Sequence, residues 1–370
     1  MSFLTRIFGK TKKGGASVIG IDIGSSSLKV VQLRREGGTA VLETYGELAL
    51  GPYAGAEAGQ ATNLSAAVIT ETLNDLLREA NVTTKDAGIS IPFSRSLLTL
   101  IELPKRENPE EQKTVIELEA RKYIPVPVSE VQLDWFIIPE FPAEGAEPSG
   151  EAELASVKVQ VLLVAVHNDE LALLESVVQG AQLAASFYEI EIFSTIRAVV
   201  DEPVKPVMVL DIGASATKVY VVEHGVVAFS HNIPQGGQDV TRTIATANSL
   251  TVKKAEELKK EHGFADGKEA YDRSTIELVF SHIFEEARRV STQYQMLHGK
   301  TVSALVLTGG GGVTKELEQY AKTFFSVNVE IANPFSKVQA PAFMRPVLEA
   351  IGPEFAVAVG LALRKLEEIA

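Results

Sequence analysis

Two short stretches of the chain carry aspartate, glycine and serine at matching spacing. The matching residues are Asp22, Gly24 and Ser26 in VIGIDIGSSSLKVVQL, and Asp211, Gly213 and Ser215 in VMVLDIGASATKVYVV. Glycine lets backbone approach a ligand, successive N–H groups in such a turn form an anion-binding concavity, and serine hydroxyls add donors. Each aspartate is placed to hold Mg²⁺ through water, because Mg²⁺ usually binds one or two carboxylates together with phosphates. One such turn is weak evidence, but the repeated pattern predicts a polyphosphate site.

The residues around each motif predict a β-hairpin. An apolar run rich in Val and Ile ends in Asp and Gly, a short turn follows, and a second apolar run begins. Later in the chain, four glycines at 309–312 separate the buried strand SALVLT from a helix predicted to begin near Thr314. Such a loop lets a ligand lie against backbone at the carboxyl end of a strand. A flexible turn is the alternative interpretation.

The composition excludes several classes of function. A chain of 370 residues exceeds the size at which one hydrophobic core stops growing, so two or more lobes are expected. The net charge of -13 argues against nonspecific binding to nucleic acid or to an anionic membrane. Without cysteine there are no disulfides, thiol nucleophiles or thiolate metal sites, and six scattered histidines give little support for a transition-metal site.

Residues 1–17 predict a tail outside the folded part. Phe3, Leu4, Ile7 and Phe8 fall on one helical face and basic residues follow them, but this apolar part is too short for a signal peptide. A short amphipathic element that touches a partner or an anionic membrane surface and a disordered leader are both open. Nowhere do 18 consecutive apolar residues occur without charge, so no transmembrane helix is predicted.

Between the hairpins, the pattern predicts an α/β unit and then a block with a core of its own. The strand AGISIP ends at Pro92, and a βαββα pattern follows from Phe93 to about Leu183. This block contains the Pro-rich IPVPVSEVQLDW and the buried strand KVQVLLVAV. A separate subdomain with a partner surface is the favoured interpretation, and a decoration of the first lobe is the alternative. EIEIFSTIRA then forms a helix-like link back into the first lobe.

The second half of the chain predicts a similar α/β unit with longer helices. TVKKAEELKKEH predicts a helix that ends at Gly263, and a long amphipathic helix is expected from Ser274 to Leu297. The last helix, from Phe355, contains the small-residue run AVAVG, which suits close packing of one helix against another.

Together these motifs resemble the actin-like ATPase superfamily, which includes sugar kinases, heat-shock chaperones, actin and the bacterial division protein FtsA. The segments GIDIGSSSLKVVQL, ARKYIPVPVSEVQLDW, EIEIFSTIRA, LTGGGG and FAVAVGLALR resemble one branch, the PilM family of cytoplasmic type IV pilus assembly proteins. The resemblance runs from about Ile19 to Lys365. It implies an α/β, two-lobed actin-like fold of duplicated RNase H-like domains, with a small α+β subdomain inserted in the first lobe.

The resemblance also implies a division of the chain. Residues 1–17 are the tail and residues 93–187 the inserted subdomain. The first lobe takes residues 18–92, 188–205 and 354–370, and the second lobe takes residues 206–353.

ATP and Mg²⁺ are the cofactors that the resemblance implies. Asp22 and Asp211 would lie near Mg²⁺ and serve catalysis, and Glu191 would orient a hydrolytic water. The implied nucleotide contacts are Gly24, Ser25, Ser26, Ser27, Lys29, Gly213, Ala214, Ser215, Glu256, Lys259, Gly309, Gly310 and Gly311. Without the resemblance, Lys29 is interpreted as a solvated strand residue, and Glu256 with Lys259 as an ordinary surface ion pair.

The implied function is an ATP-binding cytoplasmic scaffold at the inner membrane, with at most a weak ATPase activity. Nucleotide would close the lobes and change the shape presented to the cytoplasmic N-terminus of the membrane protein PilN. That peptide would lie in a groove formed by the first lobe and the inserted block. Other proteins of the pilus platform and motor and further copies of the chain are also implied as partners. Nucleic acid is not, and membrane association would be indirect.

Two alternative functions remain. An FtsA-like division protein is disfavoured, because FtsA carries a basic amphipathic membrane helix after a C-terminal linker and this sequence ends on LRKLEEIA. A small-molecule kinase of the actin fold would need a carboxylate as general base toward a substrate hydroxyl. No further aspartate stands in a recognisable base motif.

Overall fold

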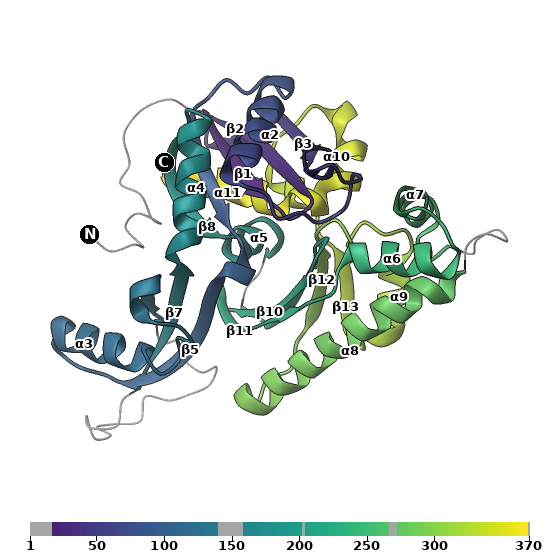
Figure 1. The fold of residues 1–370 in the computed structure, drawn as a ribbon. Helices are drawn as coiled ribbons and strands as arrows, with labels where there is room; N and C mark the ends of the chain where they lie inside the picture. Colours follow the sequence, from purple (N-terminus) through teal and green to yellow (C-terminus); the bar gives the residue numbers. More distant parts are fainter. Residues whose placement is uncertain (1–16, 140–157, 202–203, 266–271, 369–370) are drawn as a thin grey trace.

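The computed structural model describes residues 17–139, 158–201, 204–265 and 272–368. It shows two lobes, each built on a sheet, and a smaller block that extends from the first lobe beside the second (Figure 1). The predicted α/β class and two-lobed actin-like architecture are confirmed. Residues 1–16 of the predicted tail lie outside the described residues, and Ser17 already belongs to the first strand.

The two large sheets have the same topology. The first has the order β3-β2-β1-β4-β8 and the second β11-β10-β9-β12-β13. In both sheets the first three strands of this order pair antiparallel with their neighbours. The fourth strand pairs parallel with the third and with the fifth. The strands of the first sheet are β1 (Ser17–Ile23), β2 (Ser27–Glu36), β3 (Thr39–Ala49), β4 (Asp86–Ile91) and β8 (Ala184–Ile190). Those of the second are β9 (Val207–Ile212), β10 (Thr217–Glu223), β11 (Val226–Ile233), β12 (Ala304–Thr308) and β13 (Asn328–Ile331).

Helices cover both faces of the first sheet. Successive side chains of a strand point to opposite faces, so Ile19 and Ile21 pack toward α2 (Ala66–Glu79) and α4 (Asn168–Gly180), while Val18 packs toward α11 (Ala356–Glu368). On that second face α11 also contacts α5 (Glu191–Val199).

The second sheet is covered differently on its two faces. Alternate residues such as Leu210 and Val221 pack against the lobe's own helices. These helices are α6 (Gly237–Ala247), α7 (Val252–His262), α8 (Arg273–His298) and α9 (Leu317–Phe324). Tyr220 and Val222 belong instead to the core cluster of the first lobe. The hydrophobic core is therefore continuous between the lobes.

The inserted block contains a three-stranded antiparallel sheet of the order β5-β7-β6. Its strands are β5 (Ser96–Pro104), β6 (Val131–Ile137) and β7 (Lys158–His167). Helix α3 (Pro109–Ala120) covers one face through Ile116 and Ala120. The sequence Asn-Pro-Glu-Glu begins this helix, and the Asn108 side chain caps it by accepting a hydrogen bond from the Glu110 N–H.

Packing shifts two of the predicted domain boundaries. The boundary at 187 falls inside β8, which pairs with β4, and α4 contacts α2, so both elements belong with the first lobe. The boundary at 353 is also too late. Phe335 and Leu348 pack on the first lobe, and α10 (Arg345–Ile351) lies in this returning segment. Sequence periodicity did not reveal this, because both shifts depend on contacts between distant segments.

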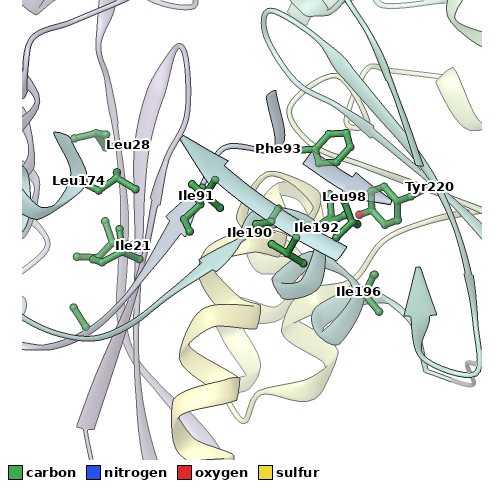
Figure 2. Close-up of a cluster of buried hydrophobic side chains, with 14 of the residues drawn as sticks. Ile21, Leu28, Ile91, Phe93, Leu98, Leu174, Ile190, Ile192, Ile196 and Tyr220 are labelled. Carbon is green, nitrogen blue, oxygen red and sulfur yellow. The ribbon is translucent and has the colours of Figure 1, made fainter. Parts of the chain in front are cut away.

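Figure 2 shows the core cluster at the junction of the three parts. Ile190 and Ile192 of the first lobe lie at the centre of this cluster. On one side of them are Phe93 and Leu98, at the start of the inserted block, and Tyr220 of the second lobe. All five side chains are at most 8% exposed. Burial on this scale ties the block to both lobes, because apolar contacts there cannot be separated without exposure to water.

One stretch, Ala342–Glu368, is long and apolar enough to cross a membrane by length and composition. Of the 18-residue window that gives this stretch its apolar character, 61% is buried inside the folded protein. Its main part, α11, packs on β1 and α5. A buried core helix passes the same test, so this stretch is weak evidence for a membrane span.

The predicted close packing of the last helix is confirmed. A Cβ at Gly360 would lie 1.9 Å from the Ser194 carbonyl oxygen in α5, and one at Gly20 would lie 2.0 Å from the Ala358 carbonyl oxygen. Both neighbours are backbone, which cannot rotate away. Helix α11 therefore sits directly on the backbone of β1 and α5.

We expect Gly360→Ala to lower the free energy of unfolding by about 3 kcal/mol, because overpacking a tight core forces backbone shifts. Denaturant unfolding measures the change. Gly310→Ala is the control, since nothing lies within 4 Å of a Cβ there. Equal stability of the two variants would contradict the packing argument.

Candidate functional site

The cleft between the lobes encloses a cavity of about 1010 Å³. Every residue predicted for the site lines it. They are Asp22, Gly24, Ser25, Ser26, Ser27, Lys29, Glu191, Asp211, Gly213, Ala214, Ser215, Glu256, Lys259, Gly309, Gly310 and Gly311. The structure thus brings all of them to one place, while their individual roles stay predictions.

The two hairpin turns have the same backbone geometry and face each other. The Gly24 N–H donates to the Ser27 carbonyl over 3.1 Å, and the Gly213 N–H donates to the Ala216 carbonyl over 3.0 Å. Ser215 Oγ donates to Ser25 Oγ over 3.1 Å, across the two lobes. A ligand bound by both turns would therefore touch both lobes.

The glycine loop after β12 lies against the second aspartate. Gly309 has φ +81°, and a Cβ there would lie 2.4 Å from Asp211 Oδ1. The Gly311 N–H donates to the Ile212 carbonyl over 2.8 Å. Gly310 faces open space instead. The loop therefore needs glycine for its conformation and leaves a bare backbone surface in the cleft. The following helix begins at Leu317, later than the predicted Thr314.

Asp22 is buried at the end of β1, where it accepts a hydrogen bond from Ser90 Oγ over 3.0 Å. Burial raises its pKa from about 3.8 to about 6, because the charged form is poorly solvated there. The Lys29 ammonium opposes this shift, and the negative charge of Glu191 adds to it. The folded protein thus holds this carboxylate at a cost.

Lys218 is a site residue that the sequence reasoning missed. Its Nζ lies 2.8 Å from Glu191 Oε2 and 3.3 Å from Asp211 Oδ2. Burial favours the neutral amine, but the charges of Asp211 and Glu191 outweigh it and raise the pKa of Lys218. The signal was available, because Lys218 in the second hairpin corresponds to Lys29 in the first.

Lys29 has different partners from its counterpart. Its Nζ lies 3.0 Å from Glu47 Oε1 and donates to Ser27 Oγ over 2.7 Å. The side chain is 12% exposed, so the interpretation of Lys29 as a solvated strand residue is wrong. Glu47, on β3, was also missed because nothing in its local sequence marks it.

Both carboxylate oxygens of Glu191 are engaged. Oε2 pairs with Lys218, and Oε1 accepts a hydrogen bond from the Phe93 N–H over 2.7 Å. Glu191 is the first residue of α5, and the two residues before it end β8, so the predicted helical link is part strand. Each oxygen has a second lone pair, so Glu191 can still accept a hydrogen bond from a water in the cleft.

Glu256 and Lys259 form a largely buried ion pair on α7. Their Nζ–Oε2 distance is 2.6 Å, and Lys259 also donates to Thr241 Oγ1 and to the Gly237 carbonyl. Their side chains are 14% and 15% exposed, respectively, so this is not an ordinary surface ion pair. Gly59 of the first lobe lies beside Glu256. The pair forms a wall of the cleft where the lobes approach.

The donor set fits Mg²⁺ with a nucleotide. Asp22 and Asp211 would supply hard oxygen ligands, the two turns would supply backbone donors, and Gly310 would leave room for a flat group. Within the described ranges, no group of three or more His, Asp or Glu side chains is arranged to hold a metal ion.

Comparison with known proteins assigns this architecture. A family model described as type IV pilus assembly protein PilM matches residues 20–366. The chain belongs to the PilM family. The solved PilM-PilN type IV pilus biogenesis complex contains a chain 26% identical to this one, with a TM-score of 0.79, and the match covers 96% of this chain and 99% of that chain.

The chain resembles other actin-like proteins more distantly. The division protein FtsA of Streptococcus pneumoniae serotype 2 is 23% identical over 88% of this chain and 77% of its own length. The FtsA of Rhizobium meliloti is 26% identical, but the match spans 45% of this chain and 42% of that protein, less than half of either. MreB5 of Spiroplasma citri bound to AMPPNP is 13% identical with a TM-score of 0.52, which shows the fold alone.

We expect Asp22→Asn to stabilise the nucleotide-free protein. A carboxyl pKa raised to about 6 means that ionisation costs stability above that pH, by about 3 kcal/mol at pH 7.5. The cost falls as pH falls from 6 to about 3.8, since the acid is then protonated in the folded state, and it is gone below about 3.8, where the acid is protonated in both states. Thermal unfolding across this range should show the variant's advantage shrinking below pH 6. A constant or negative advantage would contradict the assignment.

Proposed function

We propose that the protein is an ATP-binding scaffold of the type IV pilus assembly platform. The observation that supports it most is the cleft, where matching hairpin turns from two lobes converge on one cavity of nucleotide size. Membership of the PilM family supports the pilus role. In this proposal ATP binds with Mg²⁺ near Asp22 and Asp211, the serine turns hold the phosphates, and the glycine loop lies against the base and ribose.

Nucleotide would act mainly by holding the lobes together. Ser25 and Ser215 come from different lobes, so phosphates between their turns favour the closed arrangement. A ligand shifts such an equilibrium by its difference in affinity for the two arrangements. Hydrolysis would be slow, because Lys218 and the Phe93 N–H hold Glu191, the predicted water-orienting residue, in place by one contact to each oxygen.

PilN is the proposed partner. The similarity to a chain of the PilM-PilN complex, at 26% identity over nearly the whole length, supports this assignment. The part of PilN that binds would be its N-terminal cytoplasmic peptide, in an extended form. Through it the protein would lie at the cytoplasmic periphery of the inner membrane, with other platform and motor proteins and further copies of the chain as additional partners.

The sheet of the inserted block offers a surface for this peptide. Opposite α3, the side chains of Leu100, Leu162 and Phe136 align across the three paired strands. Phe136 is 46% exposed, although it is a large apolar residue. A cavity of about 330 Å³ lies on this face.

This cavity involves the second lobe more than the sequence suggested. Its lining comes from β5 and β7, from Val227–Ser230 of β11, and from Leu297 and His298 of α8. A peptide there would contact both the block and the second lobe. Its affinity would then depend on how the lobes are arranged, which gives nucleotide a way to control partner binding.

We expect Phe136→Ser to weaken binding of a PilN N-terminal peptide by about tenfold or more, because a half-buried aromatic anchor contributes on that scale. Isothermal titration calorimetry measures it. Leu118→Ser on α3 is the matched control, since Leu118 is 56% exposed on the other side of the sheet. Equal loss in both variants, or none in either, would place the peptide elsewhere.

We also expect MgATP to change the affinity for this peptide in the wild-type protein but not in an Asp22→Ala, Asp211→Ala double variant. The variant lacks both proposed metal ligands. Calorimetry with and without MgATP tests the coupling. If the wild-type protein binds nucleotide but no PilN peptide, the partner assignment is wrong, and small-molecule kinase substrates become the next candidates.

A further inference from the structure

Glu191 joins the three parts of the molecule. It begins α5 of the first lobe, its Oε2 lies 2.8 Å from Lys218 Nζ of the second lobe, and its Oε1 accepts the Phe93 N–H over 2.7 Å. Phe93 is the first residue of a 3-10 helix, Phe93–Arg95, that leads from β4 into β5 of the inserted block. A buried carboxylate thus connects the cleft to the start of the block by direct contacts.

Lys218 lies where bound phosphates would compete for it. It lines the cavity between the two turns, and its ammonium interacts with Asp211, Glu191 and Asp22. The side chain is 15% exposed, so it is open to the cleft but poorly screened by water. A phosphate oxygen there would form a charge-assisted hydrogen bond with Nζ, of the same kind as the bond to Glu191.

The equivalent lysine of the first hairpin is not connected in this way. Lys29 pairs with Glu47 and donates to Ser27, all within the first sheet. Both lysines line the same cavity. Loss of either cation would remove positive charge from the cleft. Lys218 contacts Glu191 and, through it, the inserted block, whereas Lys29 pairs with Glu47.

We propose that Lys218 senses the nucleotide phosphates and that Glu191 transmits its displacement to the inserted block through the Phe93 N–H. The inference rests on the proposed ATP binding and adds its means of regulation. When phosphates draw Nζ away, Glu191 loses its ammonium partner and rearranges to satisfy the exposed lone pairs. Its bond to Phe93 then changes.

A change at Phe93 matters because of where its ring lies. The side chain packs with Leu98 of β5 and Tyr220 of β10 in the cluster between the block and the second lobe (Figure 2). Close-packed side chains transmit small shifts rather than absorb them. The block would therefore change its position against β11, where the cavity for the peptide lies.

Hydrogen exchange at the Phe93 amide tests the proposal. The exchange is measured on proteolytic fragments of the protein that begin before Ser90. With saturating Mg-AMPPNP, the exchange rate should change by about threefold or more in the wild-type protein. It should not change in Lys218→Met, and it should still change in Lys29→Met. Saturation is verified for each variant by calorimetry. An unchanged rate in the nucleotide-bound wild-type protein, or a normal response in Lys218→Met, overturns the proposal.

Glu191→Gln keeps the experiment decisive if Lys218→Met does not fold. This substitution keeps the shape of the side chain and removes the charge that holds Lys218, so the variant should bind AMPPNP and lose the Phe93 response. A retained response rules out transmission through Glu191. If the wild-type protein binds no nucleotide, the proposed function fails as well as this inference. If nucleotide binds and Phe93 does not respond, this inference fails by itself.

Discussion

The ammonium of Lys218 holds together a set of negative charges that would otherwise repel one another in the floor of the cleft. Asp211 of its own lobe and Glu191 of the other lobe both lie within 3.3 Å of it. Removing buried charges from water is costly and is offset only by good geometry. The relative position of the lobes therefore depends on this contact, as does the exact placement of both carboxylates.

The two hairpins have similar sequences, but their equivalent lysines have different partners. Their turns have the same hydrogen bonds, and each carries a lysine seven residues after its aspartate. Lys29 finds Glu47 on the neighbouring strand, whereas Lys218 reaches across the cleft to Glu191. The difference lies in what each sheet faces. The first sheet is covered by its own helices, while one face of the second packs on elements of the first lobe.

The same shared core explains how a change in the cleft would alter the position of the inserted block. Its first residue, Phe93, has its backbone bound to the cleft carboxylate and its ring buried against Tyr220 of the second lobe. A block attached only at the surface of the first lobe would have neither contact. If the protein has the proposed function, this arrangement would place partner binding and nucleotide binding on the same connected set of side chains.

The sequence by itself determined the hairpins, the cap at Asn108 and the small-residue face of α11. These depend on short-range spacing, which strands, turns and helix ends express locally. Most of the residues that meet in the cleft were indicated by the resemblance to a known family, and local spacing alone marked only the two hairpin turns and the glycine loop. Tertiary structure decided the rest: the partners of Lys218, the bond from Phe93 to Glu191, the place of β8 in the first sheet and the return of residues near Leu348 to the first lobe. Each of these joins segments far apart in the chain, so the local pattern of either segment carries no record of the other.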